Sequence, residues 1–394
     1  MKRKKLVAIF AALMVALSTS IPVFAAENTK ISSIIDQDIP SSYIEEVIQC
    51  NSDIDPTCPW TQDTQVKETI PTYDLDNNVS GYILNLSTNG NDTGYMVYDI
   101  SSGEPVLAEF GYEGVYSIQG EEVTKKSELG QSKLIPVGMN EYVLQRGNDL
   151  YTLKTNTKIT DKKDKIQNIL EQKEANIAEY VQREQMASTL STRAQEIFAS
   201  VSIPNLWKSG YTPIMMKNYG DASCVAICNV NMLKYWHECR NIPSLYNSYD
   251  EPNLSQTVSR MRTQVNEELY YVEELKKSYY LASTQDGLDG IYKYCSTYAC
   301  TSPKSSEISK KGAKFDWDEY IDQINNGNFV FIGAKEKHYE GKTTNVGHAF
   351  SGVGYQKTST GNFLRVGDQW TNNYSHFFNT MYSSDIIRTF YCQW

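Results

Sequence analysis

The sequence lacks both a surplus of positive charge and long hydrophobic runs. Its 394 residues carry 37 Lys and Arg against 47 Asp and Glu, a formal net charge of −10 at pH 7. This balance argues against a surface for polyphosphate chains, so we expect no nucleic-acid partner. The longest apolar run, residues 6–18, is shorter than the roughly 20 residues that a membrane-spanning helix needs. No internal repeat is found.

The apolar run near the N-terminus is typical of an export signal. It follows KRKK at residues 2–5 and precedes the small-residue stretch Val23-Phe24-Ala25, where a cut is expected. We therefore expect residues 1–25 to be a signal peptide and the protein to be secreted to the extracellular space, with no membrane contact after signal cleavage. An uncleaved membrane anchor is the alternative.

The rest of the composition is that of a globular chain. Hydrophobic residues make up 40% and charged residues 21%, which excludes a disordered or fibrous protein. A chain of this length favours two domains of roughly 150 to 200 residues each. The 28 tyrosines suit extracellular strands and binding clefts.

The first half of the chain shows strand patterns and then a helix pattern. Residues 82–87 and 93–100 are β-rich runs separated by Asn89-Gly90-Asn91-Asp92, which predicts a hairpin. We expect residues 26–160 to form a small α+β domain.

A charged segment follows this domain. Apolar residues recur at helical spacing over residues 161–185, which predicts an amphipathic helix. The next residues, 186–195, are small and polar and suit an exposed linker that a protease can cut. Residues 161–198 are thus interpreted as a charged helix and a processing linker.

The second half, residues 199–394, is expected to place helices before strands, which is typical of a segregated α+β domain. Residues 224–238 are apolar on nearly every face, so they predict a buried central helix. Further helical patterns cover 254–282 and 316–326, and strand patterns cover 328–334, 348–356 and 362–370.

Eight cysteines in an exported chain suggest disulfides or a reactive thiol. Cys50 with Cys58, and Cys295 with Cys300, are spaced to close small loops, although sequence alone does not determine the pairing. A zinc site at Cys224, Cys228, His237 and Cys239 is an alternative interpretation, but that spacing matches no usual finger or ribbon.

Cys224 is the candidate nucleophile because it opens the predicted buried helix. The amides of a helix N-terminus favour a thiolate, and Asp221 or Ser223 is a plausible N-cap. Cys228, one turn further, is expected to be a core residue. The alternative is that Cys224 is itself a buried structural or disulfide-bonded cysteine.

His348 is the candidate base. If residues 348–356 pair with 362–370 through a turn at 357–361, His348 lies opposite Asp368. The Asp368 carboxylate would then orient the imidazole. Trp370 lies on the same face, where its indole would shield the hydrogen bond between them from water. A purely structural His348 is the alternative, and we expect His237, His338 and His376 to be surface or structural residues.

The order of these parts resembles the papain-like cysteine peptidases. Cys224-Val225-Ala226, then Val346-Gly347-His348-Ala349-Phe350, then Val366-Gly367-Asp368-Gln369-Trp370 follow the cysteine, histidine and asparagine or aspartate order of that family. The resemblance is greatest to the secreted bacterial branch, the streptopain-like and bacteriocin-processing-peptidase-like enzymes, and covers about residues 200–392. It implies a papain-like catalytic domain with Cys224 as nucleophile, His348 as general base and acid, and Asp368 as the orienting residue.

One position departs from the family pattern. The family has a glutamine about six residues before the nucleophile, and this chain has Asn218. We expect Asn218 and the Cys224 backbone N–H to form the oxyanion hole.

The resemblance also implies a zymogen whose N-terminal propeptide domain inhibits it. The expected function is a secreted, monomeric cysteine endopeptidase that acts on peptide or protein substrates and needs no metal or organic cofactor. An acyl transferase with the same Cys-His-Asp site and a non-catalytic cell-surface binding protein are the alternatives.

Overall fold

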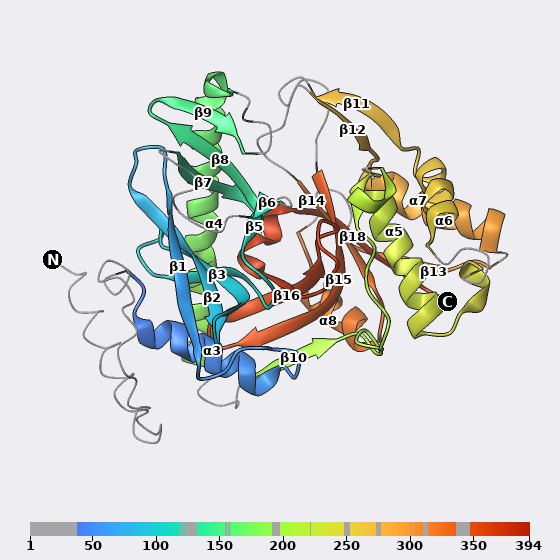
Figure 1. The fold of residues 1–394 in the computed structure, drawn as a ribbon, viewed down its shortest axis with the longest axis horizontal. Helices are drawn as coiled ribbons and strands as arrows, with labels where there is room; N and C mark the ends of the chain where they lie inside the picture. The colour runs from blue at the N-terminus through green and yellow to red at the C-terminus, as the bar shows by residue number, and fades with distance from the viewer. Residues whose placement is uncertain are drawn as a thin grey trace.

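The computed structural model describes residues 38–118, 121–122, 132–153, 156, 158–190, 198–220, 222–247, 253–272, 277–299, 301–309, 314–335 and 347–394. The expected signal peptide and His338 lie outside these residues. The described chain combines helices with one large mixed sheet, which confirms the α+β class (Figure 1). Within this part of the chain, no helix is long and apolar enough to cross a membrane.

One sheet runs through the molecule. Its 14 strands include the ordered path β13-β18-β14-β15-β16-β17-β4-β3-β2-β1-β7-β8-β9, and β10 pairs with β15. We call residues 38–190 the N-terminal segment and residues 198–394 the C-terminal segment. The two segments meet where β17 pairs antiparallel with β4, with His376 opposite Gly111. The sequence predicts two units, and an edge strand of each joins them into one sheet.

The N-terminal segment is a helix followed by antiparallel strands. Its hairpin between β2 and β3 is confirmed, and Asn89 and Gly90 have the positive φ angles of 52° and 81° that this turn requires. The elements are α3 (Ser41–Ile54), β1 (Thr64–Tyr73), β2 (Val79–Thr88), β3 (Asn91–Asp99), β4 (Val106–Gly111), β5 (Ser117–Ile118), β6 (Glu121–Glu122), β7 (Lys133–Gly138), β8 (Glu141–Arg146) and β9 (Asp149–Thr152).

The predicted amphipathic helix is confirmed as η3 (Thr160–Lys162) and α4 (Lys163–Leu190). Ile166 and Ile177 on its apolar face are buried. The helix continues through residues 186–190, which were expected to be linker, because small and polar residues can still extend a helix that is already formed. Residues 191–197 lie outside the described residues.

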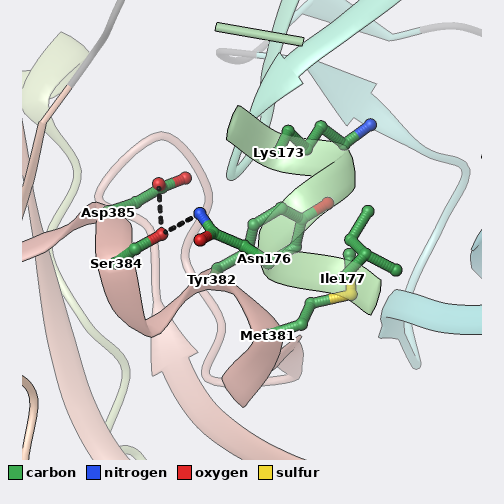
Figure 2. A pocket seen from close by; sticks show the side chains of 7 residues that line it. All are labelled: Lys173, Asn176, Ile177, Met381, Tyr382, Ser384 and Asp385. Atoms are coloured by element: carbon green, nitrogen blue, oxygen red, sulfur yellow. Dashed lines mark hydrogen bonds between the residues drawn. The ribbon is translucent and has the colours of Figure 1, made fainter. Parts of the chain in front are cut away.

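Helix α4 packs against both segments. Figure 2 shows Asn176 of α4 facing Ser384 of η9 (Thr380–Asp385), and the Asn176 amide donates to the Ser384 hydroxyl at 2.9 Å. The cavity left beside them is only about 10 Å³, roughly the space of one water molecule. The helix is therefore closely packed on the C-terminal segment.

In the C-terminal segment α5, α6 and α7 lie together beside the strands, and α8 packs on the sheet apart from them (Figure 1). As predicted, every residue of α5 is buried. The elements are β10 (Ala199–Ser202), η4 (Met216–Tyr219), α5 (Cys224–Lys234), the π-helical turn η5 (Tyr235–Cys239), η6 (Pro243–Leu245), α6 (Ser255–Gln264), β11 (Glu268–Val272), β12 (Lys277–Leu281), α7 (Thr284–Tyr294), η8 (Cys295–Ala299), β13 (Lys304–Ser309), α8 (Trp317–Asn325), β14 (Val330–Lys335), β15 (Gly347–Thr358), β16 (Gly361–Gly367), β17 (His376–Asn379), η9 and β18 (Ile386–Gln393).

Two predictions from the sequence need correction, one in each segment. Residues 268–272 and 277–281 pair as the strands β11 and β12 and do not continue the helix, because their tyrosine-rich runs favour strands. Cys50 and Cys58 are free thiols, so the disulfide that their spacing allows is not formed. Cys295 is also free, and Cys300 lies outside the described residues.

Candidate active site

Cys224 is the first residue of α5, where the sequence predicted the nucleophile. Ser223 is the N-cap, and its hydroxyl accepts a hydrogen bond from the Ala226 amide at 3.3 Å. Asp221, the other candidate cap, lies outside the described residues. The amides of this first turn give the Cys224 sulfur an environment that favours negative charge.

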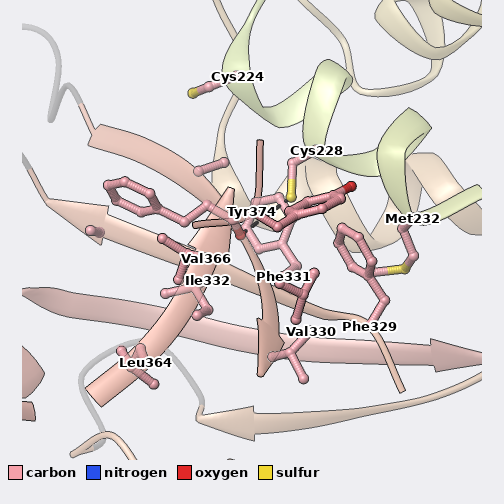
Figure 3. Close-up of a cluster of buried hydrophobic side chains, with 14 of the residues drawn as sticks. Cys224, Cys228, Met232, Phe329, Val330, Phe331, Ile332, Leu364, Val366 and Tyr374 are labelled. Atoms are coloured by element: carbon pink, nitrogen blue, oxygen red, sulfur yellow. Dashed lines mark hydrogen bonds between the residues drawn. The ribbon is translucent and has the colours of Figure 1, made fainter. Parts of the chain in front are cut away.

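Helix α5 packs against β14 and β15, and Figure 3 shows it beside Phe331 and Ile332 of β14. The Cys228 thiol, one turn after Cys224, donates to the Phe350 carbonyl of β15 at 3.4 Å. In Figure 3, Met232 lies towards the Phe329 end of β14, and Cys224 lies towards the opposite end.

The pairing of β14 with β15 then locates the histidine. Ala334, near the far end of β14, is paired with His348. Cys224 and His348 are therefore at the same end of the layer that α5 and the sheet form. Both are buried, with exposed fractions of 9% and 5%.

His348 and Asp368 do meet, but not as predicted. The β15–β16 ladder pairs Ser351 with Gly367, two residues away from the expected register, because the turn consists only of Ser359 and Thr360. Strand β16 ends at Gly367, so Asp368 lies in the loop that follows. The contact is between His348 Nε2 and the backbone carbonyl oxygen of Asp368, at 2.6 Å, and not with the carboxylate.

This contact determines the histidine tautomer. A carbonyl oxygen can only accept a hydrogen bond, so Nε2 of His348 must carry a proton. In the neutral imidazole the other ring nitrogen, Nδ1, is then the atom that can accept a proton from a thiol.

Trp370 covers the histidine. Its ring stacks on that of His348 with centroids 3.9 Å apart and an interplanar angle of 10°. Stacking covers one face of the imidazole, and the shielding role expected for Trp370 remains a prediction. Phe350 contacts the same imidazole edge-on, at a centroid distance of 4.7 Å.

The Asp368 carboxylate organises its own loop. Oδ1 accepts hydrogen bonds from the Trp370 amide at 3.0 Å, the Thr371 amide at 2.9 Å and the Thr371 hydroxyl at 2.8 Å. These bonds close a turn that aims the Asp368 carbonyl at His348 and brings the indole onto the imidazole. Asp368 thus orients His348 through its backbone, and the side chain acts one step further away.

Asn218 lies in η4, on a turn attached to the same loop. The Met216 amide donates to the Gln369 carbonyl at 3.0 Å, so the Asn218 turn adjoins the Asp368–Trp370 loop. The Asn218 side chain is exposed. The structure therefore brings Asn218, Cys224, His348, Asp368 and Trp370 onto neighbouring elements.

Several supporting residues were not predicted. Gln369 has a positive φ of 64°, and its buried amide donates to the Ala349 carbonyl at 3.0 Å. Glu267 accepts a hydrogen bond from the Ser223 amide at 2.9 Å, which holds the chain just before Cys224. An ion pair with Arg262 at 2.5 Å fixes the Glu267 carboxylate. Of these supporting residues, only Gln369 could have been suspected from the sequence, because it lies between Asp368 and Trp370.

The zinc alternative finds no support in the described residues. No group of three or more His, Cys, Asp or Glu side chains among them is arranged to hold a metal ion. His237 stacks on Tyr246 with ring centroids 4.0 Å apart, as a structural histidine does. His376, also expected to be a surface or structural residue, is buried.

Comparison with known proteins adds no assignment. No family model matches this chain, and no curated protein sequence matches it.

Proposed function

We propose that this protein is a secreted cysteine endopeptidase, made as a zymogen, with a papain-like catalytic domain in the C-terminal segment. The observation that carries the proposal is the hydrogen bond from His348 Nε2 to the Asp368 carbonyl, because it leaves Nδ1 as the basic nitrogen at the end of the layer where Cys224 lies.

The proposed reaction follows acyl-enzyme chemistry. His348 Nδ1 takes the proton of the Cys224 thiol, and the thiolate attacks the carbonyl carbon of the scissile peptide bond. The oxyanion accepts hydrogen bonds from the Cys224 amide and from Asn218. The imidazolium then protonates the leaving amine, and a water activated by His348 hydrolyses the thioester.

The raised pKa values of the other described cysteines support the choice of Cys224. Burial raises the pKa of the Cys58 and Cys295 thiols to about 12 and that of Cys239 to about 11. Burial also raises the pKa of Cys50, Cys228 and Cys392. These six thiols are therefore neutral at pH 8 and react slowly with alkylating agents.

The experiment is iodoacetamide labelling at pH 8, with the label located by mass spectrometry, together with hydrolysis of a peptide substrate. We expect the label on Cys224, no hydrolysis by Cys224→Ala, and most of the activity retained by Cys228→Ala. Cys228 is the matched control because it lies one turn away on the same helix. Equal loss in both variants, with thermal unfolding unchanged, would refute the assignment.

The same assay separates the alternatives. An added amine that captures the acyl group faster than water does would favour a transferase. A folded protein whose Cys224 remains unlabelled would favour a non-catalytic binding protein.

A further inference from the structure

The Asp368 carboxylate is linked to a tyrosine of the N-terminal segment. Thr371, which donates to Oδ1 of Asp368, has its hydroxyl 3.1 Å from Nε2 of His376 in β17. The other ring nitrogen of His376, Nδ1, lies 2.9 Å from the hydroxyl of Tyr95 in β3. Tyr95 and His376 have exposed fractions of 2% and 7%, so bulk water has little access to these contacts.

The donors in this chain follow from the partners. The Thr371 hydroxyl gives its proton to the Asp368 carboxylate, which can only accept, so towards His376 the same oxygen must be an acceptor. His376 Nε2 therefore carries a proton. In the neutral ring Nδ1 is then an acceptor, and the Tyr95 hydroxyl donates to it.

Tyr95 is suited to that role. Burial, together with the negative charges of Glu109 and Asp368, raises the pKa of its hydroxyl well above the ordinary value, so the proton stays on the oxygen. Gly111, opposite His376 in the ladder, leaves the necessary room, because a Cβ there would lie 2.6 Å from the Tyr95 ring.

We propose that Tyr95 and His376 are positioning residues of the active site, which act on His348 through Thr371 and the Asp368 loop. The inference rests on the proposed function. All the hydrogen bonds point the same way, from Tyr95 through His376 and Thr371 to Asp368, and hydrogen bonds in such a chain polarise and strengthen one another. The N-terminal segment would then contribute a residue to the catalytic geometry and would not only cover it.

The mechanical consequence concerns the aim of the Asp368 carbonyl. The Asp368 Oδ2 lies 3.5 Å from Nε2 of His376, which keeps the proton on that nitrogen. Without the Tyr95 hydroxyl, Nδ1 is a buried acceptor that has lost this donor, so the ring is held less firmly beside Thr371 and Asp368. The turn that holds the Asp368 carbonyl and Trp370 would then loosen.

The test compares Tyr95→Phe with Tyr98→Phe in the uncleaved full-length protein, in which Tyr95 lies beside His376. Tyr98 is the matched control: it is a buried tyrosine of the same strand, and its hydroxyl contacts only the Met96 sulfur, at 3.6 Å, among the hydrogen bonds of the described residues. For Tyr95→Phe we expect the rate constant for alkylation of Cys224 by iodoacetamide to fall about tenfold, since a misoriented base leaves less of the thiol ionised. Tyr98→Phe should keep the wild-type rate constant.

The outcomes separate the two proposals. A purely structural Tyr95 would lower the unfolding temperature but leave the alkylation rate of Cys224 in the folded protein unchanged, which would overturn the inference while the peptidase assignment stands. A wild-type protein that neither hydrolyses peptides nor labels at Cys224 would overturn both.

Discussion

A buried ion pair across the two segments offers a quantitative test of how the N-terminal segment is held. Arg365 of β16 and Asp55, just after α3, are joined at 3.0 Å, and each side chain is 1% exposed. Arg365 also donates to the Thr57 hydroxyl at 2.7 Å, and Gln356 donates to Asp55 at 2.9 Å. The linker connects the same two segments, so its cleavage alone leaves these contacts in place.

The perturbation is Arg365→Met, which retains an apolar side chain but leaves the Asp55 charge buried without its cation. Removing one partner of such a pair costs about 3 to 5 kcal/mol. The hydrogen bonds that remain on Asp55 favour the lower figure, and about 3 kcal/mol corresponds to a weakening of roughly a hundredfold in the dissociation constant.

The assay uses a protein with a specific protease site inserted at residues 191–197. After cleavage, we expect the wild-type segments to stay together in gel filtration and to remain nearly inactive towards peptides. The Arg365→Met segments should separate at concentrations about a hundredfold higher, with activity appearing as they do. Ser359→Ala is the control, since Ser359 bonds Glu46 across the same boundary at 2.7 Å but is exposed to solvent.

Low pH should weaken the ion pair between Arg365 and Asp55. Burial alone would raise the pKa of Asp55, but the Arg365 charge and the hydrogen bonds from Thr57 and Ser200 outweigh it and lower the pKa. A lowered pKa gives stability that is present above the unfolded value of about 3.9 and lost as the pH falls through the folded value.

If Arg365→Met segments bind each other as tightly as wild-type segments, the ion pair does not hold the N-terminal segment in place.

Two further predictions concern buried carboxylates. Asp368→Asn should retain a higher kcat than Asp368→Ala, because an amide oxygen can still accept the three loop hydrogen bonds that Oδ1 accepts, and both variants keep the backbone carbonyl that contacts His348. Equal losses of kcat would contradict the role of the side-chain oxygen in holding this loop. Burial raises the pKa of Glu109 to about 8, whereas in the unfolded chain this carboxyl ionises near about 4.3, so the protein loses stability as the pH rises between these two values. Glu109→Gln should therefore raise the unfolding temperature more at pH 9 than at pH 5. A change in unfolding temperature that is the same at both pH values would contradict this.

Local patterns predicted much of the C-terminal segment. An apolar run with no polar face predicted α5, and three β-rich runs predicted β14, β15 and β16. The position of Cys224 at a helix start followed from its neighbours alone.

The orientation of His348 could not be predicted in the same way. It depends on where β16 stops, on the two-residue turn at Ser359 and Thr360, and on a positive φ at Gln369, which strand alternation does not encode. Strand pairing across long separations is equally invisible to local patterns, so neither the β4–β17 contact nor the link from Tyr95 to His376 was foreseen.

The two roles proposed for the N-terminal segment impose opposite demands on it. As an inhibitor it must leave the C-terminal segment, whereas as the source of the Tyr95 hydroxyl it must stay beside His376. The demands are compatible because the hydrogen bond that His376 Nδ1 accepts does not require a tyrosine. Once β4 withdraws, β17 becomes an edge strand open to solvent, and a water molecule can donate to Nδ1 at a modest entropic cost. The loop at Asp368 would then be held less rigidly but in the same tautomeric state, so release of the segment opens the site without reversing the orientation of His348.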